Sequence, residues 1–183
     1  MIRAPFSSPE VLRRLQPGFA SAPLRSLLLP GACEPDEVRA FVAAARFEKF
    51  DLADRGRYEL AEPDAPALLR ELRRFAQGAS GRTLGRGTLR LQRFRRGGYA
   101  LLLDDARTRL ATGIEVTLDL SESFAGPPAV YSAGPDLKLF IPQSPGLAAV
   151  VERTPYLTRY DRYLPQGVGR KQVVRLRAAF VPA

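Results

Sequence analysis

The most informative feature of this 183-residue chain is a residue type that it lacks, because it contains no histidine. Without an imidazole there can be no Ser-His-Asp triad and no Cys-His pair, and the commonest nitrogen ligand of metal ions is missing. Cys33 is the single cysteine, so it can form no disulfide within the chain and has no imidazole base to activate it. These absences exclude catalysis by a Ser-His-Asp triad or by a Cys-His pair.

The chain also lacks long apolar runs. No segment approaches the roughly 18 apolar residues that span a bilayer, and residues 1–23 contain no apolar stretch of signal-peptide length. Together with the single cysteine, this predicts a cytoplasmic protein. The content of 45% hydrophobic and 26% charged residues is typical of a folded domain, and the length suits one domain with its own core.

Positive charge is abundant, since the formal net charge is +9 and the sequence pI is about 10.4. A basic protein attracts polyanions, so nucleic acid is one predicted partner. However, the arginines are scattered along the chain, and only three residues, Lys49, Lys138 and Lys171, are lysines. This scatter favours compositional bias over a dedicated nucleic-acid surface, and both interpretations stay open.

The first half of the chain carries helix and hairpin signals. A short buried strand is predicted over 26–32, and a helix follows in which Pro35 and acidic residues suit the first turn. Residues 47–60 predict a hairpin, and an apolar stripe predicts a second helix from Asp64 to Gly78. We expect residues 1–25 to form a loose extension in front of a single domain over 26–183.

The second half consists of short, often alternating apolar runs between glycine and proline turns, which indicates strands. The predicted strands cover 88–94, 99–104, 113–120, 128–133, 137–142, 146–152 and 173–180. This order predicts an α+β fold whose second half is a sandwich or jelly roll. The arginine- and tyrosine-rich stretch 156–163 is expected to form an edge strand with solvated arginines, and Arg175 and Arg177 to line one face of a half-exposed strand.

One stretch carries a resemblance to a known family. The segments RFRRGGYALLLDDARTR (93–109) and GIEVTLDLSE (113–122), with the order of the preceding elements, resemble the prolyl-hydroxylase-like branch of the 2-oxoglutarate and Fe(II)-dependent oxygenases. The likeness extends over about residues 26–182. It implies N-terminal helices packed on a double-stranded β-helix, or jelly-roll, core. It also implies a His-x-Asp pair, a second histidine, and a basic residue that grips 2-oxoglutarate.

The positions of that motif hold other residues in this chain. Leu103 stands at the first histidine, and Asp105 matches the acid. Asp161 is the nearest match to the second histidine, with Tyr163 as another occupant. The basic residue corresponds to Arg170 or, after a shift of the alignment, to Arg175.

A leucine cannot bind a metal ion, and the carboxylates of Asp105 and Asp161 alone would form a weak oxygen site that suits Mg²⁺, Mn²⁺ or Ca²⁺ better than Fe²⁺. We therefore expect no cofactor, and neither Fe(II) nor 2-oxoglutarate. In an alternative interpretation, Asp104 and Asp105 end a strand and form solvated ion pairs with nearby arginines.

The resulting hypothesis is a non-catalytic oxygenase fold, a pseudoenzyme that acts as a binding or scaffolding module. Its pocket would be rimmed by Tyr99, Arg107 and Tyr163, and would take a small anion, a peptide or a partner protein. One alternative is an enzyme with altered metal ligation by Asp105 and Asp161. Another is a basic module that binds nucleic acid or a different polyanion, and an edge strand could also support oligomerisation.

Overall fold

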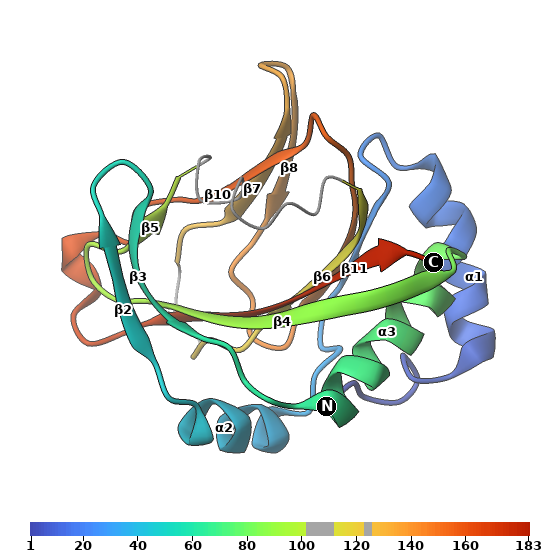
Figure 1. Ribbon diagram of the computed structural model, residues 1–183, viewed down its shortest axis with the longest axis horizontal. Helices are drawn as coiled ribbons and strands as arrows, with labels where there is room; N and C mark the ends of the chain where they lie inside the picture. The colour runs from blue at the N-terminus through green and yellow to red at the C-terminus, as the bar shows by residue number, and fades with distance from the viewer. Residues whose placement is uncertain (102–111, 123–125) are drawn as a thin grey trace.

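The computed structural model of the protein describes residues 1–101, 112–122 and 126–183 (Figure 1). The helices in these residues are α1 (Pro9–Ser21), α2 (Pro35–Ala44), α3 (Pro66–Ser80) and the short 3-10 helix η2 (Gln166–Val168). The strands of the first half are β1 (Ser26–Leu29), β2 (Glu48–Leu52), β3 (Gly56–Ala61), β4 (Leu84–Phe94) and β5 (Tyr99–Ala100). The later strands are β6 (Gly113–Asp119), β7 (Ala129–Ala133), β8 (Leu137–Ile141), β9 (Ala148–Arg153), β10 (Thr158–Asp161) and β11 (Val173–Pro182).

All the strands belong to one antiparallel sheet that curls into a nearly closed barrel. The strand order is β1-β9-β6-β11-β4-β3-β5-β10-β7-β8. Among the described residues, the remaining strand, β2, pairs only with β3 and is not part of this order. Figure 1 shows β4 and β11 crossing the molecule side by side, with α3 against them and α1 on the outer side of α3. This is the α+β jelly roll, or double-stranded β-helix, that the sequence predicts.

The central strands β6 and β11 are buried on both faces. Leu176 and Ala178 of β11 belong to the main apolar core, which also contains Leu72 and Phe75 of α3. Because successive side chains of a strand point to opposite faces, Arg175 must point the other way, into the barrel. The charged side chains of these strands therefore face an enclosed interior.

Helix α1 is the main element that the sequence did not predict. Its side chains Leu12 and Phe19 are buried, and the helix packs against α3, so residues 9–21 are part of the folded core and not a loose extension. Pro17 lies inside the helix and Gly18 follows it, and both residue types weaken helix propensity. Burial against α3 outweighs this local preference.

The predicted end of α3 at Gly78 is wrong by two residues. The helix continues to Ser80 and ends at Gly81, which adopts a left-handed conformation with φ of 71°. Gly78 is required for close packing instead, because a Cβ at this position would lie 2.7 Å from Cδ1 of Leu12. The glycine allows α1 and α3 to approach each other.

The predicted strand over 99–104 is seen as β5 for its first two residues, and residues 102–104 lie outside the described residues. Among the helices that the structure describes, none is long and apolar enough to cross a membrane.

Candidate functional site

The interior of the barrel holds a group of buried charged side chains. Each of them is at most 8% exposed to solvent. We call this group the buried charge cluster; its members are Glu115, Asp161, Arg153, Arg159, Arg175 and Arg177. Charged residues are rarely buried unless they are paired, so the contacts within the cluster decide what it can do.

The strands bring these side chains together by simple alternation. Glu115 lies on β6 between Ile114 and Val116, which both belong to the core beneath the helices. On β11, Val173 shares a face with the cluster arginines and belongs to a separate apolar group at one end of the barrel. Ala149 of β9 belongs to another apolar group inside the barrel. The cluster thus lies between apolar groups that shield it from water.

Glu115 is the centre of the first half of the cluster. Arg177 donates two hydrogen bonds to its carboxylate, from Nε to Oε1 at 3.0 Å and from Nη2 to Oε2 at 2.9 Å. The guanidinium groups of Arg153 and Arg159 lie at 3.6 Å and 3.7 Å from the carboxylate oxygens. The hydroxyl of Tyr131 also donates a hydrogen bond to Oε1. Glu115 is therefore surrounded by groups that favour its charged form.

These surroundings shift the pKa values of two side chains, Glu115 and Tyr131. Burial alone would raise the pKa of Glu115, but the positive charges of Arg177, Arg159 and Arg153 outweigh it and hold the pKa well below its ordinary value. Burial, followed by the negative charge of Glu115, raises the pKa of the Tyr131 hydroxyl. At neutral pH the glutamate is thus ionised and the tyrosine is a neutral hydrogen-bond donor.

Asp161 forms the second half of the cluster. Its Oδ1 accepts a hydrogen bond from Nη1 of Arg175, and Nη2 of Arg159 lies 3.2 Å from its Oδ2. Arg175 also donates from Nη2 to the carbonyl oxygen of Pro127 at 2.9 Å. Arg159 contacts Asp161 and Glu115 and donates from Nη1 to Oε1 of Gln92 at 3.4 Å. Arg159 therefore links the two carboxylates into one network.

The structure brings two of the predicted site residues together, namely Asp161 and Arg175, which are in direct contact. Arg170 lies elsewhere, in an exposed position after η2. Leu103, Asp105 and Arg107 lie outside the described residues, so their predicted roles stay predictions.

The two predicted rim tyrosines are oriented by local contacts. The hydroxyl of Tyr99 donates a hydrogen bond to the carbonyl oxygen of Ala53 at 3.2 Å. Tyr163 is 48% exposed and accepts a hydrogen bond from Nε2 of Gln166 at 2.7 Å. Neither tyrosine is among the residues that contact the charge cluster in the described part of the chain.

Two expectations about arginines are wrong. Arg159 was expected on an edge strand with its side chain in water, yet β10 lies between β5 and β7 and Arg159 is 3% exposed. Arg175 and Arg177 were expected on a half-exposed strand, yet they are 2% and 8% exposed. In each case the strand is covered on both faces. This burial depends on strands that are far away in the sequence, so the local sequence does not reveal it.

The sequence prediction did not include Glu115, Tyr131, Arg153 and Arg159 in the site. A signal for Glu115 exists in hindsight: it is the only charged residue in the apolar run 114–118 of a central strand. A lone acid in such a run needs a buried cationic partner. Several scattered arginines could have filled that role, so the partners could not be assigned.

The residues of the cluster do not fit a ferrous ion of the oxygenase type. That site needs two neutral imidazoles and one carboxylate, and this chain has no histidine. Oδ1 of Asp161 accepts a hydrogen bond from Arg175, and Oδ2, which accepts no hydrogen bond from the described residues, lies 3.2 Å from Nη2 of Arg159. Within residues 1–101, 112–122 and 126–183, no group of three acidic or cysteine side chains is placed to hold a metal ion.

Comparison with known proteins supports the fold. No family model and no curated sequence matches the chain. Among solved structures, it is similar to a prolyl-4-hydroxylase from Pseudomonas putida, with a TM-score of 0.71 and 13% identity over 94% of this chain and 100% of that one.

Two further structures share this architecture. A 2-oxoglutarate and Fe(II) oxygenase-family oxidoreductase from Burkholderia pseudomallei has a TM-score of 0.70 and 13% identity over 93% of this chain and 90% of that one. A prolyl hydroxylase from Trichoplax adhaerens has a TM-score of 0.71 and 10% identity over 95% and 90%. The fold is therefore that of the Fe(II) and 2-oxoglutarate-dependent oxygenases.

Proposed function

We propose that this protein is a catalytically inert oxygenase fold, a pseudoenzyme that acts as a binding or scaffolding module. The observation that carries the proposal is the contact between Asp161 and Arg175 inside the barrel. This carboxylate neutralises a buried guanidinium. If it bound a metal ion instead, the guanidinium would lose its charge partner, which is energetically costly.

The absence of histidine supports the same conclusion. Oxygen activation of this type requires a metal with three open positions, and the two imidazoles that would hold it have no counterpart here. An alternative site built on Asp161 would have to displace both Arg175 and Arg159. The buried ion pairs thus oppose altered ligation as well as the ordinary kind.

The charge cluster also gives the barrel a structural role. An ion-pair network that is buried inside the barrel is held by hydrogen bonds in fixed directions, which orients β6, β10 and β11 relative to one another. A rigid barrel with a filled interior suits a protein that presents its outer surface to a partner. The predicted oligomer contact through an edge strand would fall on β1, β2 or β8, each of which pairs with one other strand in the described part of the chain.

The direct test is a calorimetric titration of the purified protein with Fe²⁺ or Mn²⁺ in the presence of 2-oxoglutarate, combined with an assay for succinate. A prolyl hydroxylase of the same fold serves as the positive control. We expect no saturable binding and no succinate above the protein-free background. Micromolar binding with succinate release would overturn the proposal.

A further inference from the structure

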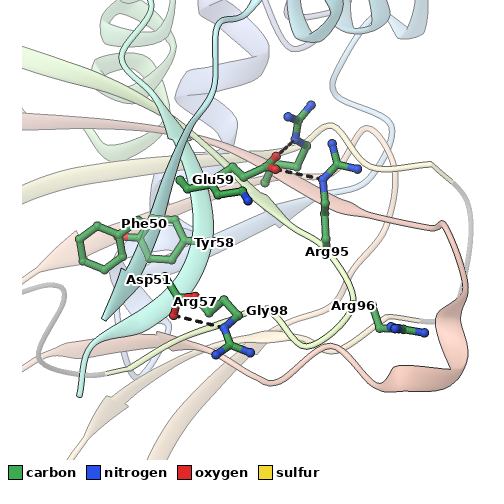
Figure 2. Close-up of a pocket in the computed structure, with 10 residues that line it drawn as sticks. Phe50, Asp51, Arg57, Tyr58, Glu59, Arg95, Arg96 and Gly98 are labelled. Atoms are coloured by element: carbon green, nitrogen blue, oxygen red, sulfur yellow. Dashed lines mark hydrogen bonds and ion pairs between the residues drawn. The ribbon is translucent and has the colours of Figure 1, made fainter. Parts of the chain in front are cut away.

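A second charged region lies outside the barrel, on the hairpin formed by β2 and β3. There the hairpin, the end of β4 and the turn 95–98 line an open hollow of about 200 Å³ (Figure 2). This volume is smaller than the roughly 300–1,000 Å³ that is typical of sites for drug-sized molecules, so the hollow suits only a small ligand.

The charged walls of the hollow come from cross-strand neighbours. Lys49 is paired in register with Glu59, Asp51 with Arg57, and Glu59 with Arg93 of β4. Because directly opposed residues of antiparallel strands share one face of the sheet, these five side chains form a continuous charged surface.

Between these charged residues the hairpin carries an aromatic pair, Phe50 and Tyr58, and both rings also line the hollow. Phe50 and Tyr58 stack with ring centroids 4.7 Å apart, and Tyr58 packs against Phe94 inside the barrel. Figure 2 shows the two rings next to each other. The aromatic pair anchors the hairpin, so the charged face is displayed on a fixed support.

Two carboxylates hold three of the guanidinium groups in place. Glu59 accepts a hydrogen bond from Nε of Arg93 on one oxygen and from Nε of Arg95 on the other, the latter at 3.1 Å. Asp51 accepts from Nε of Arg57 at 3.2 Å. Each of these contacts uses Nε, and the terminal amino groups of Arg57 and Arg95 have no partner among the described residues.

The hollow carries an excess of positive charge. Its lining contains five cationic side chains and only two carboxylates. Lys49 and Arg96 are exposed and form no hydrogen bond or ion pair within the part of the chain that the structure describes. Figure 2 shows Arg96 at the turn, apart from the paired arginines.

We propose that this hollow binds a small molecule that carries a phosphate group. Guanidinium groups match the geometry of phosphate oxygens and bind them through paired hydrogen bonds, and the fixed positions of Arg57 and Arg95 reduce the cost of ordering them. The unpaired charges of Lys49 and Arg96 supply the countercharge that a dianion requires. The small volume of the hollow suits a compact anion better than an extended nucleic-acid backbone.

This site goes beyond the proposed function, because it lies outside the barrel and does not depend on whether the interior retains chemistry. Its test uses inorganic pyrophosphate as the probe, which does not report on iron or 2-oxoglutarate. Failure of one proposal therefore leaves the other intact.

The experiment measures pyrophosphate binding to the full chain by calorimetry at about 50 mM salt. The test variant combines Lys49→Gln and Arg96→Gln, which removes two charges without removing a described contact. The matched control combines Lys138→Gln and Arg86→Gln, which removes one lysine and one arginine from exposed positions outside the hollow. Thermal unfolding of both variants checks that the fold is intact.

We expect saturable binding to the wild-type protein, about tenfold weaker binding to the test variant, and an affinity for the control within about twofold of wild type. The proposal is overturned if the wild type does not bind pyrophosphate or if both variants weaken binding equally. Tight, salt-sensitive binding of duplex DNA without pyrophosphate binding would also overturn it, in favour of a nucleic-acid surface.

Discussion

Asp161 of β10 and Arg175 of β11 contact each other across the interior of the barrel, although three strands separate β10 from β11 in the order of the sheet. Both side chains are 2% exposed. The contact joins two walls of the jelly roll that are not adjacent in the sheet.

The first prediction concerns the removal of one partner of this pair. Asp161→Ala leaves the guanidinium of Arg175 buried without its main countercharge, and such a change typically costs about 3–5 kcal/mol. We expect a loss of this size in the free energy of unfolding, measured by urea denaturation at neutral pH.

Replacing both partners by apolar side chains of similar size distinguishes a charge effect from a packing effect. The double variant Asp161→Leu/Arg175→Met leaves no uncompensated charge at this pair, so we expect it to be more stable than Asp161→Ala by about 1–3 kcal/mol. If the double variant is as unstable as the single one, the pair does not have the role assigned to it.

The second prediction concerns the hydrogen bond from Tyr131 to Glu115. Tyr131→Phe removes one donor from a buried carboxylate, and hydrogen bonds to charged groups contribute about 1.5–3 kcal/mol. We expect the midpoint of urea denaturation to fall accordingly. Tyr156→Phe is the matched control, because Tyr156 is 84% exposed and should lose no measurable stability.

The third prediction concerns acid stability. The pKa of Glu115 is lowered in the folded protein, so an unfolded chain takes up a proton at this residue more readily than the folded one. Its stabilising contribution is therefore complete above about pH 4.5 and is lost as the pH falls below that value towards the folded pKa. We expect the free energy of unfolding of the wild type to decrease steeply in this range.

The variant Glu115→Gln isolates this effect, because it cannot ionise at this position. It should be less stable than wild type at neutral pH and should show a shallower decrease in stability below about pH 4.5. Parallel curves for the two proteins would show that another carboxyl group causes the acid sensitivity.

The fold was largely predictable from the sequence, because it depends on local signals. Alternating apolar residues between glycine and proline turns predicted most of the strands, and the turn at 54–56 predicted the hairpin of β2 and β3. Helix α1 was not predicted, because Pro17 and Gly18 oppose a helix locally and only contact with α3 stabilises it.

The site was less predictable, because it depends on long-range pairing. Asp161 was identified from the resemblance to the oxygenases. Its contact with Arg175 could not be predicted, because it depends on how the sheet curves. Nothing in the local sequence separates the buried Arg159 from the exposed Arg162 beside the same strand. Which arginine is buried depends on whether the neighbouring strands cover that face.

The fourth prediction concerns helix α1. Leu12 is 4% exposed and lies against Gly78 of α3. Leu12→Ala should therefore lower the free energy of unfolding by about 2–5 kcal/mol, the range for leucine in a packed core. Leu137→Ala is the control, since Leu137 is 38% exposed. Equal, small effects would mean that the N-terminal segment is not part of the core.

The fifth prediction concerns Cys33. Burial raises the pKa of its thiol to about 12, so very little thiolate forms in the folded protein at about pH 8. We expect no reaction with an aromatic disulfide reagent in native buffer and a complete reaction in guanidinium chloride, followed by absorbance. Rapid reaction of the native protein would show that the thiol is accessible.

Whether Asp161 binds a metal ion can be decided by a crystal structure of the protein grown with Mn²⁺ and 2-oxoglutarate, with anomalous data for the metal. We expect the Asp161 carboxylate to remain hydrogen-bonded to Arg175 and no anomalous peak to lie beside it. A peak within about 2.0–2.6 Å of the Asp161 oxygens, with the guanidinium of Arg175 displaced, would contradict this expectation.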